Sequence, residues 1–317
     1  MRQFCLLLIC NCIFLGCVST EGKKILYVNS YHKGYPPSDE VTKVIEDAFS
    51  SGNHHLELIY FDSKRDGSEE HARRKTDEII SMIETFVPDA VILSDDNAVK
   101  SLVPYLMTKE QLPVVFCGVN WSCEEYGLPS VNITGMLEVL PIEELLKQMK
   151  ELYPECKKLS VITENSLTEQ NGAHLLAPIF HSLDFVTTYT LVDNFDEWKN
   201  AFITANENSD LIYLPTNGAI KDWNTIEAKA FVTQYINKPI VTCDDFMMPY
   251  CVLGMTKVAA EQGEFVVATI KQIFSGKSVV DIPVTKNKKS SGWINQKLAS
   301  KIDFRLHRED LKEIVFE

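Results

Sequence analysis

The 317-residue sequence has little of what would identify several common classes of protein. No uninterrupted apolar run reaches the roughly 20 residues of a membrane-spanning helix, which argues against an integral membrane protein. Basic residues are also scarce, because 31 Lys and Arg face 44 Asp and Glu and leave a net charge of −13. A field of that sign does not attract nucleic acid or an anionic membrane, so we expect no nucleic-acid partner.

Motifs that carry catalysis are absent as well. The chain has no Gly-rich phosphate loop, no GxSxG elbow, no HExxH helix and no CxxC pair, and its seven histidines show no metal-ligand spacing. We therefore predict no metal, no cofactor and a binding protein rather than an enzyme. A hydrolase that uses a pair of carboxylates is the alternative, since such a pair needs no sequence motif.

Residues 1–22 are typical of an export signal with a short linker. Arg2 is followed by an apolar stretch from Phe4 to Leu15, broken only by Asn11, and then by Gly16-Cys17. This ending resembles a bacterial lipobox, which predicts cleavage before Cys17 and lipidation of that residue. An ordinary secretory signal cut slightly later, near Ser19–Gly22, or a cytosolic apolar terminus, is the alternative. We expect an extracytoplasmic protein with a lipid anchor.

Five cysteines follow the signal, which leaves an odd number for disulfide pairing. Cys117 with Cys123, and Cys243 with Cys251, are close enough in sequence to bridge, whereas Cys156 has no near neighbour. Buried, reduced thiols that pack as small hydrophobes are the alternative.

Short β-rich runs alternate with helical patterns from Lys24 onward, in two successive series. The first series predicts strands at 24–29, 56–61, 89–93, 113–117 and 133–138, with helices at 38–50 and 69–86. The second predicts strands at 158–163, 185–191, 211–214, 239–243 and 252–256, with helices at 142–152, 172–182, 196–206, 225–235 and 261–274. This alternation indicates an α/β fold with two doubly wound parallel-sheet lobes, divided near Leu137–Pro141.

Ligands of open parallel sheets bind outside the carboxyl ends of the strands. That rule selects polar and aromatic residues that follow the predicted strands, and two lobes would bring them around one cleft. The candidate ligand-binding residues are Tyr31, His32, Asp95, Asp96, Asn97, Asn120, Trp121, Glu138, Glu164, Asn217, Asp244 and Asp245.

Several of these candidates have a structural alternative. Asp95 or Asp96 can cap the following helix, and Asp244-Asp245 can form a cap followed by a turn. Asn217-Gly218 has the chemistry of a turn. Trp121 can be a packing residue, and His32 can lie in a surface loop.

Longer stretches resemble a known family. In the first half of the chain the likeness lies in KKILYVNSYHKGYPPSDEVTKVIEDAF, PDAVILSDDNAVKSLV, LPVVFCGVNW and NITGMLE. In the second half it lies in KKLSVITENS, LIYLPTNGAI, PIVTCDDF and GWINQKLASKI. Together they resemble the ABC-transporter substrate-binding protein family, with the type I periplasmic-binding-protein fold. The resemblance implies a Venus flytrap that closes on a small ligand and docks on an ABC permease. It places residues 23–138 and 251–280 in lobe 1 and residues 139–250 and 281–317 in lobe 2.

The resemblance leaves the role and the ligand open. Relatives of the first lobe also precede histidine kinases, so the alternative to an importer component is an extracytoplasmic sensor that works with a separate kinase or cyclase. Many members carry Trp where this chain has Pro37, and Tyr31 or Tyr35 could replace its stacking contact. The candidate cleft has an excess of acids, which favours a ligand with an ammonium group; a carboxylate would need Arg65, a hydroxyl or backbone N–H groups. An amino acid, in particular an aromatic one, or a small amine fits these residues.

Overall fold

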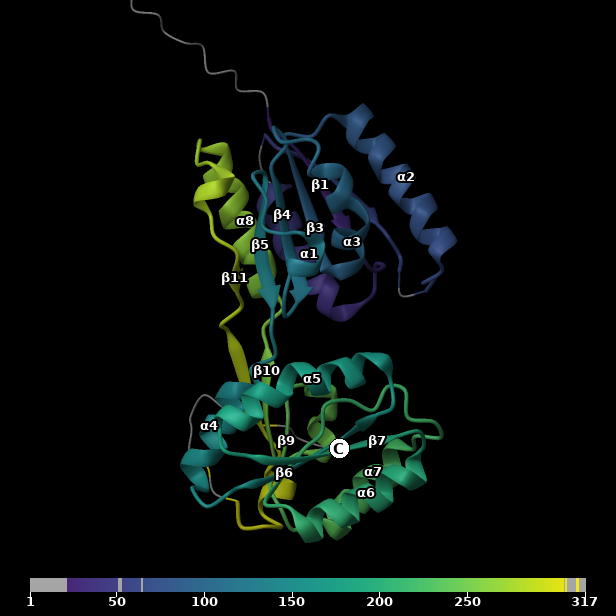
Figure 1. Ribbon diagram of the computed structural model, residues 1–317, viewed down its shortest axis with the longest axis vertical. Coiled ribbons are helices and arrows are strands. Elements are labelled where there is room, and N and C mark those ends of the chain that lie inside the picture. The colour runs from purple at the N-terminus through teal and green to yellow at the C-terminus, as the bar shows by residue number, and fades with distance from the viewer. Residues whose placement is uncertain (1–21, 51–52, 64, 305, 307–311, 314–317) are drawn as a thin grey trace, which may run out of the picture.

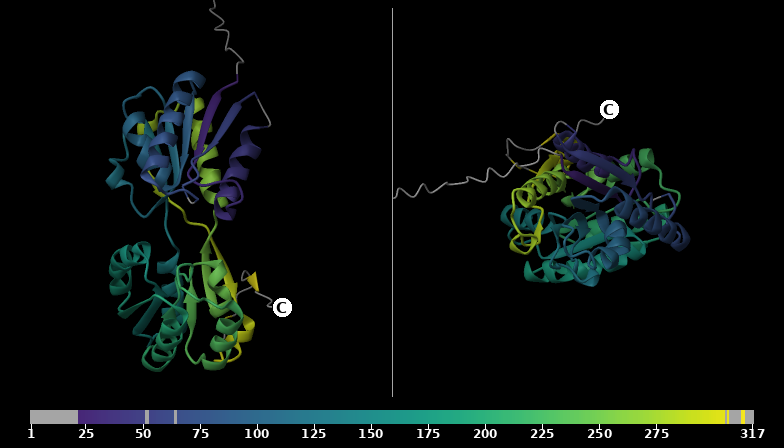
Figure 2. Two further views of the ribbon diagram at one scale, coloured as in Figure 1. Left: turned by 90° about the vertical axis from the view of Figure 1, so that its right-hand side faces the viewer. Right: turned by 90° about the horizontal axis from the view of Figure 1, so that it is seen from above.

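The computed structural model describes residues 22–50, 53–63, 65–304, 306 and 312–313. Residues 1–21, with the predicted signal and Cys17, lie outside the described residues. The chain forms two α/β lobes that follow one another along the longest axis and are joined by a narrow waist (Figure 1; Figure 2, left). Each lobe has one predominantly parallel sheet, so the predicted fold class is confirmed.

The first lobe is built around a six-stranded sheet with the order β11-β5-β4-β3-β1-β2. Its strands are β1 (Lys24–Asn29), β2 (His55–Tyr60), β3 (Ala90–Ser94), β4 (Val114–Asn120), β5 (Ile133–Glu138) and β11 (Thr285–Lys286). Its helices are α1 (Pro36–Phe49), α2 (Glu69–Phe86), α3 (Asp95–Leu106) and α8 (Ala260–Phe274), with short 3-10 turns η1 (Glu124–Tyr126) and η3 (Val279–Asp281).

Successive side chains of this sheet enter two different cores, as the alternation of a strand requires. In β1, Leu26 and Val28 join the core under α2 and α3, whereas Ile25 and Tyr27 join the core under α1 and α8. All four are fully buried. This is why the central strands are continuous apolar runs rather than alternating ones.

The second lobe repeats the plan with a seven-stranded sheet of order β13-β12-β10-β9-β8-β6-β7. Its strands are β6 (Lys158–Glu164), β7 (Val186–Val192), β8 (Leu211–Tyr213), β9 (Ile240–Thr242), β10 (Leu253–Lys257), β12 (Ser290–Ile294) and β13 (Lys312–Glu313). Its helices are α4 (Ile142–Leu152), α5 (Leu167–Ser182), α6 (Phe195–Asn208), α7 (Thr225–Tyr235) and α9 (Gln296–Ala299), with the 3-10 turn η2 (Asp245–Tyr250). The fully buried Trp198 lies at the centre of an aromatic cluster in its core.

The chain crosses between the lobes at three places, and two of them differ from the prediction. The crossings follow β5, β10 and β11. The predicted return to lobe 1 at Cys251 is wrong for β10, which pairs with β9 and β12 in the second sheet. The predicted return to lobe 2 at residue 281 is early, because Thr285 and Lys286 still pair with β5. A buried apolar strand has the same pattern in either sheet, so its sequence does not reveal which sheet it joins.

Side chains link the three crossings to one another in pairs. The Asn287 amide accepts from the N–H of Val139 at 2.7 Å and donates to its carbonyl at 3.1 Å. Glu261 accepts the backbone N–H groups of Lys288 and Lys289 at 3.0 and 2.6 Å. Lys257 forms an ion pair with Glu138. The waist is therefore held by specific polar contacts between all three segments.

Three smaller predictions are also settled by the described residues. The first helix begins at Pro36 rather than Ser38, because the fixed φ of proline suits the first turn of a helix. Cys117, Cys123, Cys156, Cys243 and Cys251 are free and buried, so neither of the two bridges that the spacing allowed is present, in agreement with the alternative of packed thiols. None of the described helices is long and apolar enough to cross a membrane.

Candidate functional site

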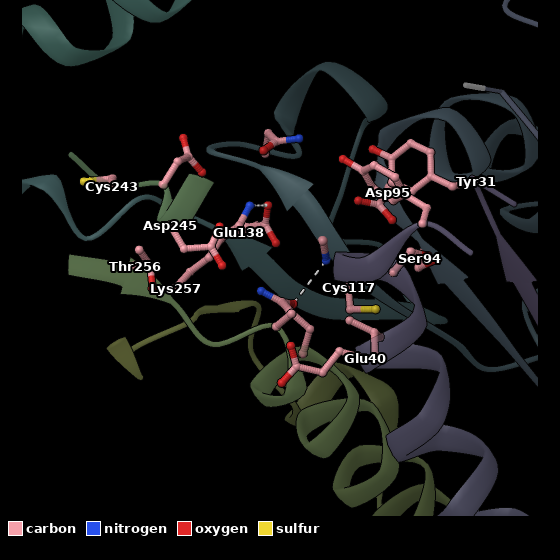
Figure 3. A pocket seen from close by; sticks show the side chains of 18 of the residues that line it. Tyr31, Glu40, Ser94, Asp95, Cys117, Glu138, Cys243, Asp245, Thr256 and Lys257 are labelled. Carbon is pink, nitrogen blue, oxygen red and sulfur yellow. Dashed lines mark hydrogen bonds and ion pairs between the residues drawn. The ribbon is translucent and has the colours of Figure 1, made fainter. Parts of the chain in front are cut away.

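A pocket of about 650 Å³ opens at the waist and is lined by residues of both lobes. The first lobe contributes Tyr31, Tyr35, Ser94, Asp95, Cys117, Gly118 and Asn120, and the second contributes Cys243, Asp244, Asp245, Phe246, Thr256 and Lys257. The rest of the pocket lining comes from residues on or beside the crossings, Glu138, Ala259 and Gln262, and from Ser38, Glu40 and Val41 of α1. Figure 3 shows Tyr31 and Asp95 at one side of the pocket and Glu138 beside Lys257.

The first-lobe side of the pocket lies at the point where the strand order of the sheet reverses. β1 and β3 are neighbours, and their connections leave in opposite directions to β2 and β4. Such a switch point leaves a crevice at the carboxyl ends of the two strands. Tyr31 follows β1 and Asp95 follows β3, and the Tyr31 hydroxyl donates to the Asp95 carboxylate. The rule that selected these residues from the sequence therefore selects neighbours in space.

Asp95 has a backbone conformation that is unusual for a residue with a side chain. Its φ is +66°, at the first position of α3, and strained backbone of this kind is concentrated at functional sites. The opposite residue is Gly118, with φ +73°; a Cβ there would lie 3.0 Å from Oδ1 of Asp95. Glycine at this bulge of β4 therefore leaves room for the Asp95 carboxylate.

Asp95 is half-buried and does not cap α3. The Ser30 hydroxyl caps the start of α3 instead, because it accepts a hydrogen bond from the Ala98 N–H at 2.8 Å and donates one to the Ser94 carbonyl at 2.5 Å. Burial, and next the negative charge of Glu138, raise the pKa of Asp95 well above its usual range, while the charge of Lys257 opposes them. The carboxylate is thus held in a place where a bound cation would stabilise its ionised form.

Lys257 and Glu138 form the polar floor of the pocket. They come from two different crossings, and their side chains are 27% and 15% exposed. Burial acts to lower the pKa of Lys257, but the charge and hydrogen bond of Glu138 and the charges of Asp244 and Asp95 outweigh it and raise that pKa. Lys257 therefore stays an ammonium, and it is the one cation among the described residues that line the pocket.

The second-lobe side carries Asp244 after β9. Burial is the main reason that the pKa of Asp244 rises to about 6; Lys257 opposes this, and the charges of Asp245 and Glu138 add to it. Beneath the two walls lie the thiols of Cys117 and Cys243, whose pKa values burial raises well above the ordinary range. Both are therefore neutral, packed side chains rather than reactive thiolates.

The structure brings together half of the residues selected from the sequence. Those that line the pocket are Tyr31, Asp95, Asn120, Glu138, Asp244 and Asp245. Those that lie outside it are His32, Asp96, Asn97, Trp121, Glu164 and Asn217.

The residues outside the pocket in the first lobe have structural environments of their own. His32 lies 3.6 Å from Asp62, which also accepts two hydrogen bonds from Arg65, so Arg65 is not the cation of the pocket. Asp96 accepts from the Asn120 amide at 2.6 Å and from the Tyr126 hydroxyl at 3.0 Å. It therefore ties α3 to the end of β4.

The other candidates outside the pocket are Trp121 and two residues of the second lobe. Trp121 packs against the hydrophobic core of the second lobe, in agreement with its packing alternative. Glu164 accepts from the backbone N–H of Ala219 at 2.6 Å, and the Asn217 carbonyl accepts from Ile220 N–H in the same turn. These two residues lie at the strand-order reversal of the second sheet, whereas the pocket uses the ends of β9 and β10 nearest the waist.

The pocket is also lined by Lys257, Phe246 and Gln262, which are not among the candidate residues selected from the sequence. The signal for Lys257 was present, because it directly follows the predicted strand 252–256. Gln262 is buried in α8 and accepts from Gly118 N–H at 3.1 Å, a contact between segments 144 residues apart in sequence. No local sequence pattern predicts a contact between residues so far apart in sequence.

A two-lobed α/β fold with a polar pocket between the lobes is typical of solute-binding proteins. Residues 69–314 match the protein family described as ABC transporter substrate binding protein, so the chain belongs to that family. The resemblance seen in the sequence is confirmed, as is the prediction of a binding protein rather than an enzyme. Proteins of this family are extracytoplasmic.

Individual relatives agree with this assignment. A tyrosine-binding protein of Clostridioides difficile (strain R20291) is 26% identical over an alignment of 228 residues, and the match covers 69% of this chain and 62% of that protein. The chain thus matches less than two thirds of that relative's length.

Solved structures share the fold at low identity. The ligand-free, open structure of a substrate-binding protein with adhesive properties from Clostridium difficile has a TM-score of 0.73 and 13% identity, covering 93% of this chain and 100% of that one. An ABC domain from Streptococcus pneumonia in complex with L-Trp has a TM-score of 0.61 and 15% identity, with the same coverage.

Proposed function

We propose that the protein is the solute-binding component of an ABC importer and that it binds an amino acid with an aromatic side chain. The observation that carries this proposal is the charge of the pocket, where five carboxylates and a single ammonium are brought together. The name of the tyrosine-binding relative and the L-Trp complex of a structural neighbour support an amino acid of this kind.

The pocket offers complementary partners for each part of such a ligand. Its ammonium would lie between Asp95 and Asp244, the two carboxylates on opposite walls whose ionised forms a cation stabilises. Its carboxylate would accept from Lys257, whose ammonium has three donors and gives one to Glu138. Tyr31 and Tyr35, with ring centroids 4.8 Å apart, supply an aromatic surface on the first lobe.

Binding would act by shifting the two lobes toward a closed arrangement. A ligand that touches Asp95 and Asp244 at once gains contacts with both lobes, and it stabilises closure by the difference in contacts between the closed and open forms. An ABC permease would recognise the closed form. The extracytoplasmic position with a lipid on Cys17 is part of this proposal.

The first test is a thermal-shift screen of residues 21–317 with amino acids, the corresponding amines, nucleosides and sugars. A ligand present at about 100 times its Kd adds roughly 2.7 kcal/mol to the stability of the folded state. We expect stabilisation by aromatic amino acids and its loss in Asp95→Asn. Asp77→Asn, a change of the same kind at an exposed position of α2, is the control and should bind as the wild type does.

Stabilisation by sugars alone, with no response to any amino acid, would refute the proposed ligand. Transport is tested separately, by uptake of the labelled ligand in cells that lack the protein. Uptake that is unaffected by its loss, together with tight binding in vitro, would favour the sensory role with a separate kinase or cyclase.

A further inference from the structure

We infer that Phe246 is the specificity-determining residue of the second lobe, and that it covers the free face of the ligand's aromatic ring. This inference rests on the proposed amino-acid ligand and names the residue that would distinguish aromatic from aliphatic side chains. It stands on three observations about the exposure, support and surroundings of Phe246.

The first observation is that Phe246 is an exposed aromatic side chain inside a ligand-sized pocket. It is 52% exposed, and of the described large hydrophobic residues with high exposure it is the one that lines the pocket. Burying an aromatic side chain of this size contributes substantially to the free energy of binding. A ligand ring that packs edge-on or face-on against Phe246 adds a further favourable contribution.

The second observation is that the local fold holds Phe246 outward. In η2 the next two residues, Met247 and Met248, are fully buried, and Tyr250 is nearly so. Met248 occupies the space above Gly254, where a Cβ would lie 2.2 Å from its sulfur. Tyr250 accepts from the indole N–H of Trp223 at 3.2 Å. Because η2 is anchored on its inner side, Phe246 cannot turn into the core without displacing these residues.

The third observation is the arrangement of the other pocket groups. Tyr31 and Tyr35 belong to the first lobe, while Phe246 directly follows the two carboxylates Asp244 and Asp245 of the second. A ligand whose ammonium lies beside Asp244 therefore has an aromatic residue of each lobe within the same pocket. A flat ring gains from both, whereas an aliphatic chain gains only from the burial of its area.

The test is isothermal titration of wild type, Phe246→Ala and Phe246→Leu with L-tyrosine, L-tryptophan, L-phenylalanine and L-leucine. We expect Phe246→Ala to weaken binding of the aromatic ligands by about 10- to 100-fold and that of leucine by less than about 3-fold. Phe246→Leu keeps an apolar side chain and should reduce the preference for aromatic ligands over leucine. Ile226→Ala is the matched control, because Ile226 is an 83% exposed apolar residue of the same lobe outside the pocket.

The outcomes separate this inference from the proposed function. Suppose that wild type binds aromatic amino acids. If Phe246→Ala binds them equally well, or if its affinity for leucine falls by the same factor as its affinity for aromatic ligands, the inference is wrong and the proposed function stands. If wild type binds none of the four amino acids, both are wrong. Unfolding temperatures of the ligand-free variants, expected to match wild type because Phe246 is exposed, verify that a loss of binding is not a loss of fold.

Discussion

Replacing Asp244 by Asn should make the ligand-free protein more stable while it weakens ligand binding. Asp244 is half-buried beside Asp245 and Glu138, and burial is the main cause of its raised pKa. An ionised carboxylate in that position therefore costs folding free energy when no ligand cation is present. Asn keeps the shape of the side chain and removes its charge, so the cost disappears, and so does a partner for the proposed ammonium.

The magnitude follows from the two pKa values. The pKa rises from an ordinary 3.8 to about 6, and one pKa unit corresponds to about 1.36 kcal/mol. The full difference is about 3 kcal/mol, and screening by solvent at the pocket mouth reduces it, so we expect a gain of about 1–3 kcal/mol. Above pH 6 the carboxyl group is ionised in the folded and unfolded states and the cost is complete. As the pH falls through 6 toward 4 the folded protein takes up the proton first, and the cost is lost.

The assay is urea unfolding of ligand-free wild type and Asp244→Asn at pH 7.5 and at pH 4. The variant should be more stable at the higher pH and equal to wild type at the lower one. Asp77→Asn, the same change at an exposed position of α2 away from the pocket, is the control and should change stability by less than about 0.5 kcal/mol. Equal stability of Asp244→Asn and wild type at pH 7.5, or a gain that persists at pH 4, would refute the electrostatic reasoning.

Three further predictions concern the pocket and the waist. Lys257→Gln should weaken binding of the amino acid by more than about 100-fold in calorimetry. The affinity for the corresponding amine, which has no carboxylate, should stay within about 3-fold of the wild-type value; equal losses for both ligands would contradict the role of the Lys257 ammonium. Gly118→Ala places a methyl group 3.0 Å from the Asp95 carboxylate at φ +73°, and should cost about 1–3 kcal/mol in urea unfolding; an unchanged midpoint would show that the site adapts freely. Asn287→Ala removes both hydrogen bonds to Val139 and should destabilise the protein by about 1–3 kcal/mol; a neutral result in the same assay would mean that water replaces them.

Much of the fold follows from the sequence because its elements are strongly patterned. The helices at 69–86 and 225–235 and the strand at 24–29 have the bounds that their apolar spacing predicts. The assignment of β10 to a lobe failed because membership of a sheet depends on the partner strands, and a short strand with four buried residues is compatible with either sheet.

The site was predictable to the extent that it depends on strand ends. Tyr31 and Asp95 were found because the reversal of strand order brings the ends of β1 and β3 together. The same rule also selected Glu164 and Asn217, which lie outside the pocket, since it states that residues lie at the edge of a sheet but not which part of that edge faces the other lobe. That choice depends on where the three crossings lie, and the crossings are set by pairing between strands far apart in sequence.

The residues that hold the waist and those that line the pocket are partly the same, and this links binding to closure. Glu138 and Lys257 join the first and second crossings and also form the floor of the pocket, whereas Asn287 and Glu261 join the remaining pairs of crossings outside it. In the proposed binding mode, a ligand carboxylate would accept from Lys257 and so change the contact between crossings that lines the pocket. The other two contacts lie outside the pocket and would keep the crossings in register. Under the proposed binding mode, a ligand would alter the angle between the lobes through this pair and leave the other two contacts of the waist in place.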